Sequence, residues 1–423
     1  MGLALLAVAM PAAAQLALPT AGGVVQDALQ AAQGGASRLD QSLQRTQGEL
    51  QGLRRLRLDA LLRSDPRTLD RDADGAIVVR SQVVALEPSE TALQAAQAAG
   101  FAIVQQRSFG ELGLRLVVLR APPGMSTQRA VQRLRQLDPQ GEYDYNHVYS
   151  GSGATVAAAE AQASAAAPAA QDAMAGFGVG LVDSGVDATH PALAGVDVQR
   201  WGCDGQVQAQ AHGTAVASLL AGSAVAQGPA ARTLYAADIY CGKSSGGAVV
   251  ELVAALAWMA QRQVPVVNIS LIGAPNRLLE RAVQALLARG HLLVAAVGND
   301  GPAAPPLYPA AYPGVIGVSA VDARLRVLPE AGRGAQVAFA AVGDLFAAAP
   351  QGRWQKQRGT SFAAPLVARL AARLLARPDP QAAAAVRAQL QAQARDLGAP
   401  GVDPVYGHGL LGADLALQRA PGR

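Results

Sequence analysis

The chain has 423 residues, a length typical of two or three domains. Hydrophobic residues make up 51% of it and charged residues 16%, which excludes an extended disordered protein, because such proteins combine low hydrophobicity with high charge. The formal net charge of +4 is small for this length, and the one arginine-rich stretch, Arg54–Arg57, has the pattern of a solvated helix face. We therefore expect no nucleic-acid partner.

The first residues have features of a secretory signal. Leu3–Met10 is a short apolar run, and Ala12–Ala14 fits the small-residue rule for signal cleavage. The basic residues that usually come first are missing, so an uncleaved anchor over residues 2–25 is the alternative, although two prolines and a Gly-Gly pair disfavour one spanning helix. We expect residues 1–14 to be a signal peptide, with export to a bacterial periplasm or the external medium and no stable membrane insertion.

Residues 24–75 are rich in Gln, Leu and Arg. Leu39, Leu43, Leu50 and Leu53 recur at roughly helical spacing, which predicts a helical spacer. We assign no function to it.

Residues 76–150 alternate strand and helix patterns in the order βαββαβ, a small split unit with one sheet and two helices. β-branched runs predict the strands, and Ser89 and Ser126 are suitable caps for the helices. The expected strands are Ile77–Leu86, Phe101–Arg107, Leu114–Leu119 and Tyr143–Tyr149, and the expected helices are Glu90–Ala99 and residues 126–137.

Two further segments complete the chain. Residues 151–172 consist mainly of Ala, Ser, Gly and Gln, which predicts a flexible linker that is easily cut. Residues 173–418 alternate apolar strands with amphipathic helices, and this pattern predicts a parallel α/β sheet with helices on both faces. In such sheets the functional residues lie at the carboxyl ends of the strands.

Cys203 and Cys241 are the two cysteines of the chain. In an exported protein an even number of cysteines indicates a disulfide, and two unpaired thiols are the alternative. The spacing of cysteines and histidines does not predict a zinc site, and we expect no metal or other cofactor.

Three polar clusters at strand ends or helix starts supply a carboxylate, an imidazole and a hydroxyl, at Asp183, His212 and Ser361. These groups suffice for nucleophilic acyl transfer, because the imidazole can take the hydroxyl proton while the carboxylate orients the imidazole. Asn299 ends another predicted strand and can donate a hydrogen bond to a developing oxyanion. Each cluster alone is ambiguous, since Asp-Ser-Gly also occurs in aspartic proteases and Gly-Thr-Ser is an ordinary turn sequence.

The chain order Asp, His, Asn, Ser is that of the subtilisin triad, and residues 173–418 resemble a subtilisin-family serine protease domain. The matching motifs are Val182–Asp187, His212–Ala217, Asn268–Leu271, Ala296–Gly301, Tyr308–Ile316, Gly359–Pro365 and Tyr406–Leu410. The resemblance implies an endopeptidase that acts on proteins or peptides through an acyl-enzyme, with Asp183, His212 and Ser361 as catalytic residues and Asn299 in the oxyanion hole. The substrate-binding residues that it implies are Ser270, Leu271, Ile272, Gly273, Ala296 and Gly298.

The expected fold class is therefore α/β, a subtilisin-like parallel sheet with helices on both faces, preceded by a small α+β (βαββαβ) propeptide-like domain. The resemblance implies that residues 76–150 are the protein's own propeptide, which inhibits in cis with its last strand in the cleft; an unrelated accessory domain is the alternative. We expect a zymogen that works as a monomer. A catalytically silent peptide-binding scaffold and an aspartic protease that dimerises through Asp183 are the rival functions.

One departure from the family pattern affects specificity. Many relatives have glycine on the wall of the cleft where this chain has Ile272. A branched side chain there is expected to narrow the pocket for the residue before the cleaved bond.

Overall fold

The structure is a computed structural model, and its description covers most of the chain. The described residues are 52, 56, 58–151, 154–155, 161–162, 176–206, 208–223, 230–243 and 245–417. The predicted signal peptide (1–14), most of the predicted spacer (24–75) and most of the predicted linker (151–172) lie outside the described residues.

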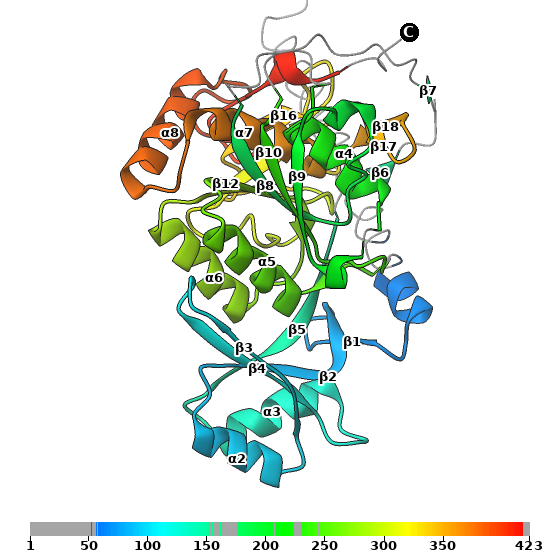
Figure 1. The fold of residues 1–423 in the computed structure, drawn as a ribbon, viewed down its shortest axis with the longest axis vertical. Helices are drawn as coiled ribbons and strands as arrows, with labels where there is room; N and C mark the ends of the chain where they lie inside the picture. The colour runs from blue at the N-terminus through cyan, green and yellow to red at the C-terminus, as the bar shows by residue number, and fades with distance from the viewer. Residues whose placement is uncertain are drawn as a thin grey trace, which may run out of the picture. The chain divides into compact units, whose positions relative to one another are not determined.

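A parallel sheet of seven strands forms the centre of the large domain, in the order β16-β15-β14-β12-β8-β10-β9 (Figure 1). Most of its residues are buried, which explains why most of these strands are apolar runs in the sequence; the edge strand β9 is the exception. The strands are β8 (Gly178–Asp183), β9 (Asp197–Trp201), β10 (Thr233–Asp238), β12 (Val266–Ile269), β14 (Leu292–Ala296), β15 (Ile316–Val321) and β16 (Phe339–Val342).

Helices cover both faces of this sheet, and the buried side chains form two large clusters. One cluster includes residues of α4 (Ala211–Leu220), α7 (Thr360–Leu374) and α8 (Pro380–Gln393). The other includes residues of α5 (Val249–Gln261) and α6 (Arg277–Ala288). The predicted parallel α/β architecture is therefore confirmed.

Short elements complete the large domain. An antiparallel hairpin consists of β17 (Asp344–Ala349) and β18 (Arg353–Arg358). The 3-10 turns are η1 (Pro191–Leu193), η2 (Cys203–Gly205) and η3 (Ala413–Leu415).

The small domain has the predicted βαββαβ order, and its sheet runs β5-β2-β4-β3. Ser89 and Ser126 cap its two helices by accepting hydrogen bonds from Ala92 and Arg129 backbone N–H groups. The elements are β2 (Ile77–Leu86), α2 (Glu90–Ala98), β3 (Ala102–Phe109), β4 (Leu114–Arg120), α3 (Thr127–Leu137) and β5 (Glu142–Gly151).

Two predicted segments contain strands that the sequence pattern did not indicate. Residues 58–64 are helical, but β1 (Leu69–Arg71) pairs with β2, so the helical prediction is wrong for the end of the 24–75 segment. Within the predicted linker, β6 (Ala154–Thr155) and β7 (Ala161–Gln162) pair with β18. Strands of two or three residues show no periodicity in the sequence, and pairing with the partner strand determines where they form.

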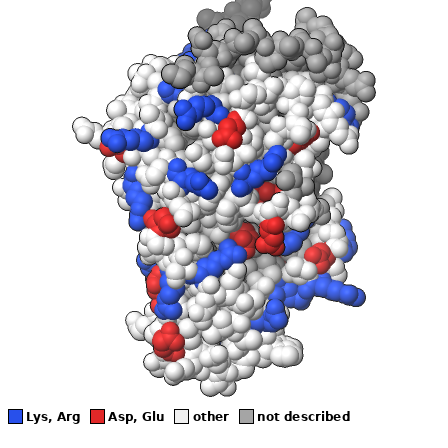
Figure 2. Space-filling model, viewed as in Figure 1, with Lys and Arg blue, Asp and Glu red and all other residues white. Residues whose placement is uncertain are grey.

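Strand β5 joins the two domains (Figure 1). It belongs to the sheet of the small domain, and its last residues also pair antiparallel with β11 (Gly247–Ala248) and β13 (Leu271–Ile272) of the large domain. Among the described residues, no helix combines the length and the apolar character needed to cross a membrane. Arginine and lysine side chains are interspersed with acidic ones on the face shown in Figure 2, in keeping with the small net charge.

Candidate active site

The carboxylate and the imidazole predicted to act together are in contact. Asp183 is the last residue of β8, and His212 is the second residue of α4. The Nδ1 atom of His212 lies 2.8 Å from Oδ1 of Asp183, and the Asp183 side chain is fully buried. This contact fixes the tautomer with hydrogen on Nδ1 and leaves Nε2 as the basic nitrogen. Nε2 is buried and makes no hydrogen bond to the described residues.

Ser184, which no motif singled out as a site residue, supports this pair. Its backbone N–H and its hydroxyl both donate to Oδ1 of Asp183, at 2.7 and 3.1 Å. Its Oγ also accepts from the backbone N–H of Gly213 at 2.9 Å, so one hydroxyl connects the carboxylate to the start of α4. The Asp-Ser-Gly motif was the available signal, because a serine next to a buried carboxylate needs partners.

Ser361 lies at the N-terminus of α7, where backbone N–H groups have no partner within the helix. Its Oγ donates to the carbonyl of Ser270 at 3.1 Å, and the hydroxyl of Ser270 donates to the Ser361 carbonyl at 2.9 Å. The preceding Gly359 has a φ of +137°, a conformation that favours glycine. The Gly-Thr-Ser motif therefore makes a sharp entry into the helix and places Ser361 in its first turn, where the residue is fully buried.

Asn299 follows the end of β14 and is held by Thr360. The Thr360 backbone N–H donates to Oδ1 of Asn299 at 3.0 Å, which leaves Nδ2 as the donor that this side chain can offer. The Thr360 hydroxyl accepts from the Gly298 N–H at 3.2 Å. Thr360 thus ties the Asn299 segment to the helix that carries Ser361, a role that the motif alone did not reveal.

The end of β5 occupies the surface between these groups. Ser150 pairs with Ile272 and Gly151 pairs with Leu271. A Cβ on Gly151 would lie 2.9 Å from Nε2 of His212, so only a residue without a side chain fits this closely. The Gly151 N–H also donates to the hydroxyl of Tyr240.

Tyr149 anchors β5 in the large domain. It is fully buried, and its hydroxyl donates to the Ala274 carbonyl at 2.6 Å. A Cβ on Gly273 would lie 2.5 Å from the Tyr149 ring, so Gly273 leaves the space that this ring fills. Burial raises the pKa of the Tyr149 phenol well above its ordinary value, which keeps it neutral as a donor.

The predicted substrate-binding residues lie in two groups. Leu271 and Ile272 pair with β5, Gly273 contacts Tyr149, and Ser270 contacts Ser361. Gly298 lies beside Ile272, since a Cβ there would be 3.6 Å from Cγ2 of Ile272. Ala296 ends β14 and is fully buried in the core, and its predicted contact with substrate stays a prediction.

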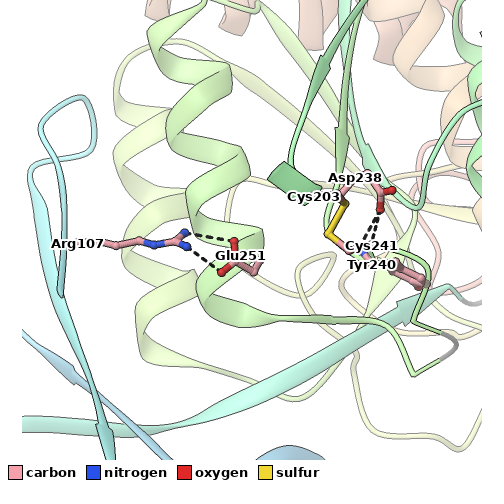
Figure 3. The surroundings of a disulfide bond; sticks show 6 residues. All are labelled: Arg107, Cys203, Asp238, Tyr240, Cys241 and Glu251. Carbon is pink, nitrogen blue, oxygen red and sulfur yellow. Dashed lines mark hydrogen bonds and ion pairs between the residues drawn. A yellow bond between two sulfur atoms is a disulfide. The ribbon is translucent and has the colours of Figure 1, made fainter. Parts of the chain in front are cut away.

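Cys203 and Cys241 form a disulfide, as predicted. It connects the turn after β9 to the turn after β10, beside Asp238 and Tyr240 (Figure 3). Asp238 accepts from the backbone N–H groups of Tyr240 and Cys241, and burial raises the pKa of its carboxyl. The bridge therefore braces the segment whose Tyr240 hydroxyl accepts from Gly151.

The fold and these residues together define an α/β serine peptidase. Residues 174–409 match the model of the subtilase family. The chain is 31% identical to subtilisin DY of Bacillus licheniformis over 255 residues, which are 57% of this chain and 90% of that protein. It is 29% identical to subtilisin E of Bacillus subtilis over 253 residues, 57% of this chain and 65% of that longer protein.

A solved structure shares the fold over a larger part of the chain. Fervidolysin from Fervidobacterium pennivorans, described as a keratinolytic enzyme related to subtilisin, aligns with a TM-score of 0.65 and 20% identity. The alignment covers 84% of this chain and 63% of that one. The chain therefore belongs to the subtilase family and is a serine endopeptidase with the subtilisin-like fold.

Proposed function

We propose that the chain hydrolyses peptide bonds with Ser361 as nucleophile, His212 as general base and Asp183 as the group that orients His212. The observation that carries this proposal is the 2.8 Å contact between His212 and a fully buried Asp183, which leaves Nε2 of His212 as the acceptor. With β5 in the cleft, the hydroxyl of Ser361 donates a hydrogen bond to the carbonyl of Ser270. Attack requires that this hydroxyl donate its proton to Nε2 instead.

The reaction then follows the chemistry of acyl transfer. Ser361 Oγ bonds to the substrate carbonyl carbon as its proton passes to His212, and the backbone N–H of Ser361 and Nδ2 of Asn299 donate to the oxyanion. His212 returns the proton to the leaving amine, and an acyl-enzyme remains. Water repeats the sequence in reverse and frees the acid product.

We propose further that residues 76–150 are an inhibitory propeptide. Its last strand, β5, pairs with β11 and β13 and ends beside His212, so it occupies the place where a peptide substrate must lie. The residues that follow are mostly small, which suits cleavage.

Buried polar contacts support a specific interface between the propeptide and the enzyme. His147 of β5 contacts Asp72 at 3.0 Å through Nε2 and the amide of Asn276 at 2.9 Å through Nδ1. Asn276 also caps α6 by accepting from the Leu279 N–H. These three interacting side chains, which come from both domains, are buried. If the domains separated, each polar group left without its partner would lose hydrogen-bond energy.

Export of the protein, to the periplasm or the external medium, is part of the proposal. The disulfide between Cys203 and Cys241 supports it, because such bonds persist in oxidising compartments.

The test is intact mass and N-terminal sequencing of the purified protein beside its Ser361→Ala variant. We expect the native protein to lose about 150 residues and the variant to stay whole. A fluorophosphonate probe should label the native protein on Ser361, and pepstatin should not inhibit it. If the native protein neither matures, takes the label nor cleaves peptides, the chain is the silent scaffold and the proposal is wrong.

A further inference from the structure

The two residues at the end of β5 give the register in which a peptide lies in the cleft. Ser150 is opposite Ile272 and Gly151 is opposite Leu271. A bound peptide that continues this antiparallel register has its next residue opposite Ser270, whose carbonyl accepts from Oγ of Ser361 at 3.1 Å. The carbonyl carbon of that next residue is therefore the one nearest to the nucleophile.

Strand geometry also decides which way this residue points. Side chains of a strand alternate between its two faces, so the residue at the nucleophile shares a face with the residue two positions earlier, the one at Ser150. Ser150 lines a small cavity of about 80 Å³. Ile272, Asp300 and Leu307 are among the residues that line the same cavity.

Two aliphatic side chains narrow this side of the cleft. Gly298, which precedes Asn299, has a φ of +99° and no side chain, yet the space beside it is filled: a Cβ there would lie 2.5 Å from Cδ1 of Leu307 and 3.6 Å from Cγ2 of Ile272. With β5 in the cleft, Leu307 is 5% exposed and Ile272 is 8% exposed. The sequence pointed to Ile272, and only the structure brings Leu307 to it.

We infer that Ile272 and Leu307 together restrict the residue on the acyl side of the cleaved bond to Gly, Ala or Ser. This inference rests on the proposed function. A longer side chain would have to displace packed aliphatic groups, and overpacking of this kind lowers kcat/KM by roughly 100-fold.

The test uses the sequence of β5 as the substrate frame. Peptides acetyl-Tyr-Ser-Gly-X-p-nitroanilide, with X as Ala, Ser, Leu, Phe or Arg, are given to the matured enzyme, whose active sites are counted with a fluorophosphonate. We expect kcat/KM for Ala and Ser to exceed that for Phe and Leu by roughly 100-fold. Leu307→Ala combined with Ile272→Gly should raise kcat/KM for Phe at least tenfold. Leu374→Ala, the same change at an exposed helix position, should leave the profile unchanged.

Each outcome decides between stated alternatives. Preference of the native enzyme for Phe or Leu overturns the inference, and preference for Arg overturns it in favour of recognition by Asp300. The native profile decides even if the double variant does not fold. Absence of hydrolysis of every peptide, together with absence of label on Ser361, would instead refute the proposed function. Sequencing of the mature N-terminus gives an independent reading, and a start at a residue that follows a bulky side chain would contradict the inference.

Discussion

Replacement of Tyr149 tests how the propeptide is held. The ring is fully buried between the domains, and its hydroxyl donates to the Ala274 carbonyl at 2.6 Å. Removing a buried aromatic side chain costs about 3–5 kcal/mol, so Tyr149→Ala should weaken the complex of cleaved propeptide and enzyme by at least ~100-fold. Tyr149→Phe removes only the hydroxyl and leaves the Ala274 carbonyl without that donor, a loss of about 1 kcal/mol or roughly fivefold to tenfold.

The assay follows the matured protein through a dilution series. Cleaved propeptide that stays bound inhibits peptide hydrolysis, and dilution releases it, so the concentration at half-maximal activity measures the dissociation constant. Because active sites are titrated separately, a fall in the amount of folded enzyme cannot be mistaken for weaker inhibition. The dissociation constant should increase from the native protein to Tyr149→Phe and again to Tyr149→Ala.

Tyr143→Phe is the matched control. Tyr143 lies in the same strand, but its ring packs in the core of the small domain and its hydroxyl donates to Asp138 of that domain. This variant should change the dissociation constant less than threefold. If Tyr149→Ala also changes it by less than fivefold, β5 does not hold the propeptide in the cleft and the reasoning is refuted.

Three further predictions concern stability and charge. Replacement of Cys203 and Cys241 by serine opens a loop with a sequence separation of 38 residues. The free energy of unfolding, measured by calorimetry, should fall by roughly 4 kcal/mol. A decrease below about 1 kcal/mol would contradict this prediction. Burial lowers the pKa of His291 in the folded state, so the unfolded state binds a proton first as pH falls below about 6.5, and stability should fall by up to about 1.4 kcal/mol per pH unit. Thermal unfolding at pH 5 and 7 should show a smaller difference for His291→Leu than for the native chain, and an equal difference would reject this origin. Arg107 and Glu251 form an ion pair with two hydrogen bonds between the domains, and both side chains are partly exposed (Figure 3). Glu251→Gln should therefore raise the propeptide dissociation constant only about twofold to fivefold, and by less at high salt. A larger increase would show that solvent does not screen the pair.

The elements of both domains were predictable because local patterns and tertiary context agree in them. Strand β2 has the predicted bounds Ile77–Leu86, and the predicted cap Ser89 does cap α2. The sequence failed where an element depends on a distant partner. Leu69–Arg71 follows a helical pattern but is a strand, because β2 offers it a free edge. The acidic turn after it includes Asp72, whose partner His147 is 75 residues away.

The candidate site divides in the same way. Asp183, His212, Asn299 and Ser361 were identified from motifs, since acyl transfer needs a few residue types in fixed chain order. Leu307 has no such signal, because an aliphatic residue in a loop is ordinary until its neighbours in space are known.

By itself, the sequence determined the family, the βαββαβ order of the small domain, the candidate catalytic residues and which disulfide the two cysteines could form. These follow from local periodicity, from motifs and from there being only one possible pair. The tertiary structure alone decided the register in which β5 pairs beside His212, that Ser184 and Thr360 hold the site together, and that Leu307 fills the space beside Gly298. The physical reason is that these contacts join residues far apart in the chain, whose register and packing depend on how the sheets and helices assemble and not on any local pattern.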